Sequence, residues 1–248
     1  MSKKMVTPYK NSNQTKKQQV TQMFDNIASN YDMLNRVISM GIDKKWRNTL
    51  VKMVQKQNPN TILDLATGTG DLALALSNIE KTRITGLDIA PEMLAIGKNK
   101  VKERELEKRI DMVVGDAESL PFDDSSIDAA TVAFGVRNFG NLDKGLQEIL
   151  RVLKPEGQLY VLETSVPSKF PFKQGYQLYS KIFLPIIGRL FSKDKSAYEY
   201  LSDSAAAFPH GEGFNNILEK NGFIEVNHHP QTLGVVTIYH AKKSNPSG

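Results

Sequence analysis

The sequence predicts one α/β domain with a seven-stranded, mostly parallel sheet and helices on both of its faces. Short apolar segments alternate with helical ones from residue 61 onward, which is the pattern of a parallel sheet covered on both sides. The length of 248 residues suits one well-buried domain and would be cramped for two. The composition, 40% hydrophobic and 24% charged, is that of an ordinary soluble globular protein.

Two helices are expected before the sheet. Apolar residues recur at helical spacing over residues 20–35, and an amphipathic segment at 43–57 carries the single tryptophan and stops at Pro59. Strands are expected at residues 61–66, 83–88, 110–115, 127–134, 158–163, 223–229 and 235–241. Helices are expected between and after them at residues 71–77, 91–106, 141–153 and 213–221, with a longer helical insertion at 171–208.

These elements are expected to form a single domain at residues 21–242, with an N-terminal helical extension at 21–58. Residues 1–20 and 243–248 are expected to be disordered tails. The first tail holds five lysines and no acidic residue, so it supplies the whole net charge of +5 and leaves the other residues neutral in sum. Because nucleic-acid proteins usually carry a basic face on the folded body, no nucleic-acid partner is expected. We interpret the tail as a solvated charge run, with weak attraction to an anionic membrane surface as the alternative.

Several classes of protein are excluded by composition. The chain has no cysteine, which excludes disulfide frameworks, Cys-ligated zinc, iron–sulfur clusters and thiol catalysis. The four histidines lack a metal-ligand spacing, so no metal is expected. No apolar run is long enough to span a bilayer and none follows the charged start, so neither a membrane span nor a secretory signal is expected. We expect a cytoplasmic protein and leave open a peripheral position at the inner face of the cell membrane.

A glycine-rich turn after the first predicted strand is the main functional signal. In the stretch LDLATGTGD at residues 63–71, Gly68 and Gly70 allow a tight bend and a close approach of the backbone to a ligand. Asp88 ends the next predicted strand, 20 residues after Gly68. A carboxylate at that place can accept both ribose hydroxyls of an adenosine ligand. The glycines with Ala73 also match the dinucleotide fingerprint, so an NAD(P)-dependent oxidoreductase is an alternative.

Two acidic positions favour S-adenosylmethionine over NAD. Asp64 lies just before the glycines, where it can organise the turn and bind the ligand's amino group directly or through water, whereas a pyrophosphate there would gain nothing from a negative charge. Asp116 and Ala117 follow the third predicted strand, where an adenine ring would lie. Asp116 can accept from the adenine amino group and Ala117 can offer its backbone amide. A plain turn-capping role is the alternative for Asp116.

Taken with three further stretches, these residues resemble the ubiquinone/menaquinone-biosynthesis C-methyltransferases. The resemblance runs from about residue 20 to 242 and is most specific near the N-terminus and after the fourth predicted strand. It is carried by residues 23–35 (MFDNIASNYDMLN), LDLATGTGD, the Leu120-Pro121-Phe122 segment, FGVRNF at 134–139 and RVLKPEG at 151–157. The resemblance implies a class I, Rossmann-like methyltransferase fold, and it adds Thr69 to Asp88, Asp116 and Ala117 as expected contacts of S-adenosylmethionine.

The resemblance also implies the reaction, a methyl transfer to a ring carbon of a prenylated quinol. The expected conversion is demethylmenaquinol to menaquinol, the last step of menaquinone biosynthesis, with methylation of a benzoquinol in ubiquinone biosynthesis as the alternative. A methyl group on a sulfonium is already activated and the ionised quinol is the nucleophile. Catalysis therefore needs positioning, stabilisation of phenolate charge and a proton acceptor.

Three residues are candidates for that work. Arg137 follows the fourth predicted strand at the ligand edge of the sheet, where a guanidinium can stabilise a phenolate, and Asn138 can donate or accept beside it. Tyr31 is expected to close over the site from the N-terminal helix. The plain alternatives are a salt bridge for Arg137 and a core position for Tyr31.

An apolar stretch at residues 178–191 is the last feature with a functional interpretation. It can form a lid that holds a polyprenyl tail or touches the bilayer, and the alternative is an ordinary buried helix. A prenylated quinol is the expected partner, and a transient membrane contact and a homodimer are left open. Other functions left open are a class I methyltransferase for another small lipid and a non-catalytic nucleic-acid or membrane-binding module.

Overall fold

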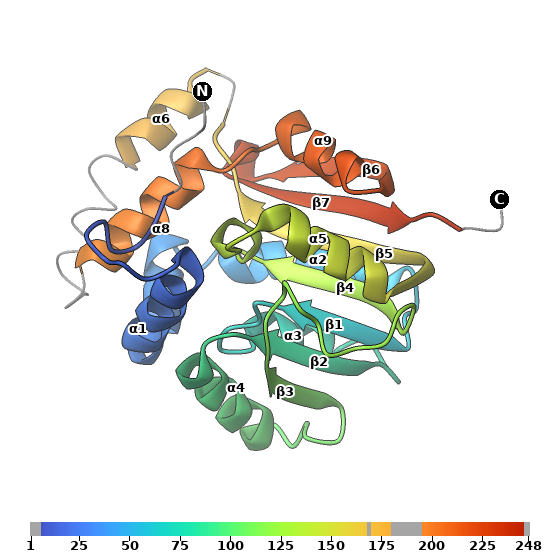
Figure 1. Ribbon diagram of the computed structural model, residues 1–248. Helices are drawn as coiled ribbons and strands as arrows, with labels where there is room; N and C mark the ends of the chain where they lie inside the picture. Colours follow the sequence, from blue (N-terminus) through green and yellow to red (C-terminus); the bar gives the residue numbers. More distant parts are fainter. Residues whose placement is uncertain (1–5, 168–169, 180–194, 246–248) are drawn as a thin grey trace.

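The computed structural model describes residues 6–167, 170–179 and 195–245. A seven-stranded sheet with the order β3-β2-β1-β4-β5-β7-β6 forms its centre (Figure 1). Neighbouring strands from β3 to β5 are parallel, and β7 is antiparallel to both β5 and β6. The predicted mostly parallel sheet is therefore confirmed. The strands are β1 (Thr61–Leu65), β2 (Arg83–Asp88), β3 (Ile110–Val114), β4 (Ile127–Ala133), β5 (Leu153–Thr164), β6 (Phe223–Gln231) and β7 (Val236–Lys243).

The side chains of the central strands alternate between two hydrophobic layers. In β1, Leu63 and Leu65 belong to the cluster that contains α5 and α9, whereas Ile62 belongs to the cluster that contains α2, α3 and α4. Both faces of the sheet are thus covered, as the apolar strands predict. The helices are α2 (Asp43–Gln55), α3 (Asp71–Leu76), α4 (Pro91–Glu103), α5 (Leu142–Val152) and α9 (Glu212–Lys220).

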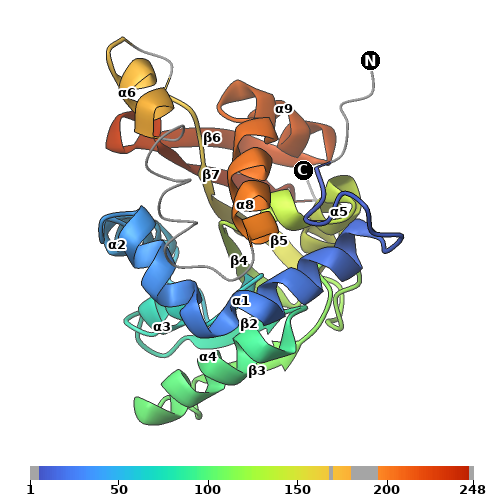
Figure 2. The ribbon, with the colours of Figure 1, turned by 90° about the vertical axis from the view of Figure 1, so that its left-hand side faces the viewer.

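Three further helices gather at the carboxyl ends of the parallel strands (Figure 1). They are α1 (Lys16–Ile38), α6 (Phe172–Leu178) and α8 (Lys195–Ala207). The turned view shows α1 crossing this end of the sheet below α8 and next to α4 (Figure 2). Buried residues of α1 pack against Ala197 and Tyr200 of α8 and against Ala90 and Met93 at the start of α4. In a parallel α/β sheet this end holds the ligand site.

The prediction of a disordered tail at residues 1–20 is wrong for residues 6–20. Helix α1 begins at Lys16, because the Thr15 side chain accepts from the Gln18 backbone N–H and the Gln18 side chain accepts from that of Thr15. Gln19 is buried and accepts from the Tyr9 backbone, which fixes the segment before the helix. These contacts compensate a composition that by itself is typical of disorder.

Smaller differences concern the ends of elements. β5 begins at Leu153, so residues 154–157, which lie between the expected helix at 141–153 and the expected strand at 158–163, belong to the strand and form a register irregularity against β4. Lys243 of the expected C-terminal tail pairs with Phe223 as the last residue of β7. The insertion at 171–208 is helical where described, in α6 and α8. Most of the apolar stretch at 178–191 lies outside the described residues.

Candidate active site

The turn between β1 and α3 is held from below by Asp64. Its two carboxylate oxygens accept hydrogen bonds from the hydroxyls of Thr67, at 2.6 Å, and Thr131, at 2.7 Å. The side chain is fully buried, and burial raises the pKa of Asp64 to about 6 although both hydroxyls act in the opposite direction. Gly68 and Gly70 take left-handed conformations at φ values of 56° and 79°, as expected for the glycines of this bend.

Asp88 ends β2 beside this turn. Its oxygens accept from the backbone N–H of Gly68 at 2.7 Å and from that of Ala90 at 2.9 Å. Burial raises the pKa of Asp88, and the backbone donors oppose that shift. The carboxylate is therefore fixed in one orientation by two adjacent loops. Each oxygen still has a second lone pair with which it can accept from a ligand.

A cavity opens above these two loops. It runs from Asp88 and Met93, past the turn after β3, to the turn after β4, and residues of α1 form its outer wall. Of the predicted site residues, the ones that line it are Tyr31, Gly68, Asp88, Asp116, Ala117 and Asn138. The mixture of apolar walls with a few polar groups is typical of a site for a small molecule.

The remaining predicted residues lie behind this wall in the described part of the chain. Asp64 is under the turn, and Thr69 donates from its hydroxyl to an oxygen of Asp32 in α1 at 2.5 Å. A Cβ at Gly70 would lie 3.1 Å from the Met112 side chain, so this glycine allows α3 to sit close to its neighbours. The structure gives these residues positions that shape the loop, and ligand contacts by Asp64, Thr69 and Gly70 stay predictions.

The N-terminal helix brings two cations that sequence analysis assigned to a solvated tail. The ammonium group of Lys17 lies 2.6 Å from Asp116 and 3.0 Å from Glu118, and Lys17 lines the cavity. Lys16 donates to the backbone carbonyls of Arg137 and Phe139, at 2.9 Å each, and burial lowers the pKa of Lys16 to about 8. Asp116 also accepts from the Glu118 backbone at 2.9 Å, which is the predicted turn-capping contact. Its contact with an adenine amino group stays a prediction.

Arg137 follows β4 as predicted, but it is not exposed to the cavity. Its Nη1 donates to Glu163 at 2.6 Å and to the carbonyl of Phe134 at 2.8 Å, and its side chain is only 8% exposed. Asn138 shares the Phe134 carbonyl, at 3.3 Å, and accepts from the hydroxyl of Tyr200 at 3.0 Å. The salt-bridge alternative for Arg137 is thus present in the structure, and a catalytic role for Arg137 and Asn138 stays a prediction.

Glu163 is the site residue that sequence analysis missed. It lies at the carboxyl end of β5, is completely buried, and is the partner of Arg137. A signal was present, since Glu163 is the only charged residue in the predicted strand at 158–163 and occupies its last position. An acid that ends an apolar strand at the ligand edge of a parallel sheet is a candidate of the same kind as Asp88.

The position of Tyr31 also agrees with its alternative interpretation as a core residue, and two of the histidines make contacts within the fold. Tyr31 makes an edge-to-face contact with Phe24 and borders the cavity, and burial raises its pKa. His228 contacts Asn215, and His240 stacks on Tyr160. Among the described residues, no group of histidine and acidic side chains could hold a metal ion, and no helix is long and apolar enough to cross a bilayer.

The donors and walls of the cavity fit S-adenosylmethionine. Asp88 offers a fixed acceptor for sugar hydroxyls, and Leu87, Ile89 and Met93 give an apolar surface beside it. At Gly68 an added Cβ would meet only the end of Met93 at 3.8 Å, so the bend leaves room for a ligand near its backbone. These features are the ones that an adenosine-containing sulfonium requires.

Comparison with known proteins agrees with this geometry. Residues 12–243 match the model of the ubiE/COQ5 methyltransferase family. The chain is 46% identical over 239 residues to demethylmenaquinone methyltransferase of Bacteroides fragilis, with 96% of this chain and 97% of the relative covered. It is 44% identical to the ubiquinone/menaquinone biosynthesis C-methyltransferase UbiE of Geotalea daltonii, with 92% and 97% covered. A Thermotoga maritima structure described as an S-adenosylmethionine-dependent methyltransferase, possibly acting on histamine, shares the fold at a TM-score of 0.63 and 17% identity, with 91% and 100% covered.

Proposed function

The chain belongs to the ubiE/COQ5 methyltransferase family, and on that premise we propose that it methylates a ring carbon of demethylmenaquinol with S-adenosylmethionine, giving menaquinol. The observation that carries the proposal is the continuity of one cavity from Asp88 to Asn138. A sugar-binding carboxylate and the FGVRNF turn therefore border the same space. The relatives named demethylmenaquinone methyltransferase, at 46% and 42% identity, support the choice of substrate.

The chain's own residues would hold the cosubstrate at the carboxyl ends of β1, β2 and β3. When bound, S-adenosylmethionine supplies a methyl group on a positively charged sulfur. Asp88 would accept from the ribose hydroxyls, and the backbone at Gly68 would allow a close approach. Ala117 and Asp116 would border the adenine, with Asp116 held in place by Lys17 and the Glu118 amide. Asp64 would act by holding the loop through Thr67.

The quinol would occupy the other end of the cavity, beside Phe134 and Asn138. Ionisation of a quinol hydroxyl raises the electron density on the neighbouring ring carbon, which is the atom that must attack the methyl group. Arg137 would stabilise that negative charge, because its Nη1 binds the carbonyl of Phe134, a residue that lines the cavity. Tyr31 would close the outer side of the site from α1. Orientation of two reactants in one enclosed space is itself a large source of rate enhancement.

A prenylated quinol resides in the membrane, so we propose that the protein is cytoplasmic and makes a transient contact with the membrane surface. Large apolar side chains are exposed near the ends of α1 and α6 and in the turn before β7, which supports this proposal. Met40 is 69% exposed, Leu178 62% and Leu233 64%. The C-terminal end of α6 adjoins that of α1, since the Tyr179 hydroxyl donates to the carbonyl of Ile38 at 2.5 Å.

Two experiments test the proposed function. Purified protein with labelled S-adenosylmethionine should transfer the label to a short-chain demethylmenaquinol that is kept reduced by dithionite. Cells that lack the gene should accumulate demethylmenaquinone. The relatives named for ubiquinone as well as menaquinone biosynthesis justify a parallel assay with a benzoquinol. Transfer to the benzoquinol alone would change the substrate, and transfer to neither quinol would contradict the proposed function.

A further inference from the structure

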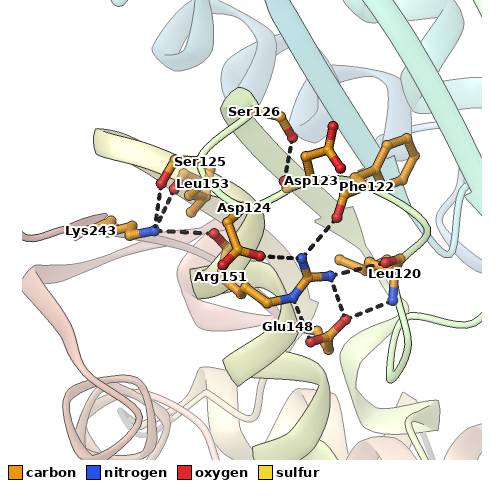
Figure 3. Close-up of polar contacts among 10 residues, drawn as sticks. All are labelled: Leu120, Phe122, Asp123, Asp124, Ser125, Ser126, Glu148, Arg151, Leu153 and Lys243. Atoms are coloured by element: carbon orange, nitrogen blue, oxygen red, sulfur yellow. Dashed lines mark hydrogen bonds and ion pairs between the residues drawn. The ribbon is translucent and has the colours of Figure 1, made fainter.

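Two arginine–glutamate pairs differ sharply in how completely they are hydrogen-bonded. Arg151 of α5 uses all five of its N–H donors (Figure 3). Its Nε and Nη2 bind the two oxygens of Glu148 at 2.8 Å each, and its remaining bonds go to Asp124 and to the carbonyls of Leu120 and Phe122. Glu148 also accepts from the Leu120 backbone at 2.8 Å. This saturated pair joins α5 to the loop before β4 and has a structural role.

The pair of Arg137 and Glu163 is incomplete. One oxygen of Glu163 accepts from Arg137 Nη1 at 2.6 Å and from the backbone N–H of Thr164 at 2.7 Å. The other oxygen, Oε2, is buried and has no partner, and the same is true of Arg137 Nε. Together they are two of only three buried side-chain polar atoms without a partner in the described part of the chain. Buried polar atoms of native proteins are nearly always satisfied, so a free donor and a free acceptor on one ion pair call for an explanation.

The position of the pair supplies one. Glu163 is the last but one residue of β5 and Arg137 lies in the turn after β4, at the same edge of the sheet as Asp88. The pair adjoins the layer of residues that lines the cavity, because Asn138 and Phe134 line it and Asn138 binds the same Phe134 carbonyl as Arg137. Three tyrosines lie within electrostatic reach of Arg137. Burial raises the pKa of Tyr31, Tyr176 and Tyr200, and the nearby charge of Arg137 opposes this rise at all three.

We propose that Glu163 accepts the proton of the quinol hydroxyl while Arg137 Nε donates to the phenolate that forms. A phenolic hydroxyl donates one hydrogen bond and accepts others, so a single hydroxyl satisfies both the free Oε2 acceptor and the free Nε donor. This inference rests on the proposed function and assigns its proton acceptor. The quinol hydroxyl reaches the pair by displacing the Asn138 side chain from the layer that covers it.

The proposed proton transfer balances over one turnover. The quinol O–H bond breaks and its proton moves to Glu163, which leaves a phenolate. The ring carbon then forms a bond to the methyl group as the methyl–sulfur bond breaks and the sulfur becomes neutral. The ring carbon loses its hydrogen as a proton to solvent, and the ring oxygen regains the proton held by Glu163. The positive charge of the sulfonium thus leaves as one proton, and Glu163 is regenerated.

The first test compares the pH profiles of Glu163→Gln and Glu148→Gln. The first variant removes the proposed proton acceptor, and the second neutralises a carboxylate of the saturated control pair. At pH 7, Glu163→Gln should lower the single-turnover rate with short-chain demethylmenaquinol by about 100-fold or more, the typical contribution of a positioned base. Its rate should then rise about tenfold per pH unit up to pH 9, because the quinol must ionise into solvent. Glu148→Gln should keep the wild-type profile and lose only thermal stability.

A second measurement does not depend on the folding of any variant. A naphthol that cannot be methylated is bound to the wild-type protein with S-adenosylhomocysteine, and its ultraviolet absorbance shows whether it is ionised. The naphtholate should be present at pH 7 in the wild type. A protonated naphthol on the wild type, or a Glu163→Gln profile parallel to that of the wild type, would overturn the inference. Failure of the wild type to methylate any quinol would instead remove the proposed function, so the two failures are distinguishable.

Discussion

Asp88→Asn is expected to weaken cofactor binding far more than it weakens the fold. In the wild type each carboxylate oxygen receives one backbone N–H, from Gly68 or Ala90, and keeps a lone pair for a sugar hydroxyl. Asparagine has one acceptor oxygen, so its amide N–H must face one of those backbone donors and one hydroxyl loses its acceptor. Hydrogen bonds to a charged group contribute about 1.5–3 kcal/mol each. The dissociation constant should therefore rise about 10-fold to 150-fold.

Isothermal titration calorimetry with S-adenosylhomocysteine measures this change without catalysis. Asp111→Asn is the matched control, because it is the same change of side chain at an exposed residue of β3, the strand next to β2 in the sheet. It should bind with the wild-type affinity. Thermal unfolding of both variants shows whether the loop has been disturbed in the absence of ligand. An Asp88→Asn protein that binds S-adenosylhomocysteine within twofold of the wild type would refute the assignment of this carboxylate to the sugar.

Three further predictions concern the loop and the helix around it. Burial raises the pKa of Asp64 from 3.8 to about 6, so the folded state should lose about 3 kcal/mol of stability as the pH rises from 4 to 6 and this side chain ionises in the unfolded state. Urea titrations of Asp64→Asn should not show this fall. An equal fall in both proteins would contradict the prediction. Gly70→Ala should destabilise the protein by about 1–2 kcal/mol in the same assay, since φ is 79° and the new Cβ would lie 3.1 Å from the Met112 side chain. No loss of stability would mean that the bend relaxes freely. Lys17→Met should lower the free energy of unfolding by less than about 1 kcal/mol, because the ion pairs of Lys17 are partly exposed. Proteolysis within residues 6–20 should nevertheless become faster. An unchanged cleavage rate would show that the ion pairs do not hold α1 in place.

Features that depend on neighbouring residues could be predicted from the sequence. The strands, the left-handed glycines and the position of Asp88 follow from periodicity and from spacing within about one strand–helix–strand unit. All seven strands lie where the pattern places them, with shifts confined to their ends. The bend after β1 could also be predicted from the sequence, because few residues other than glycine tolerate its backbone angles.

Features that depend on residues far apart in the chain could not be predicted from the sequence. Lys16 and Lys17 bind groups that follow them by 121 and 99 residues, so the N-terminal segment resembles a solvated tail until the fold brings those acceptors to it. The hydroxyl of Thr69 binds Asp32, 37 residues earlier in the chain, and this contact could not be read from spacing either. Glu163 pairs with an arginine 26 residues away on the neighbouring strand's loop, and only the order of strands in the sheet makes them neighbours.

The carboxyl edge of the sheet concentrates acidic groups, although the basic and acidic residues of positions 21–248 are equal in number. Asp64, Asp88, Asp116 and Glu163 come from the ends of β1, β2, β3 and β5, and the cations that reach them are Lys17 and Arg137. A net negative edge favours a ligand that carries a positive sulfonium over the neutral thioether that remains after methyl transfer. The negative groups attract the sulfonium charge, and the thioether has no net charge for them to attract. In the proposed reaction Glu163 at the same edge holds the hydroxyl proton of the quinol while the methyl group is transferred. The acidic residues at the strand ends can thus serve binding, proton transfer and product release through one electrostatic property.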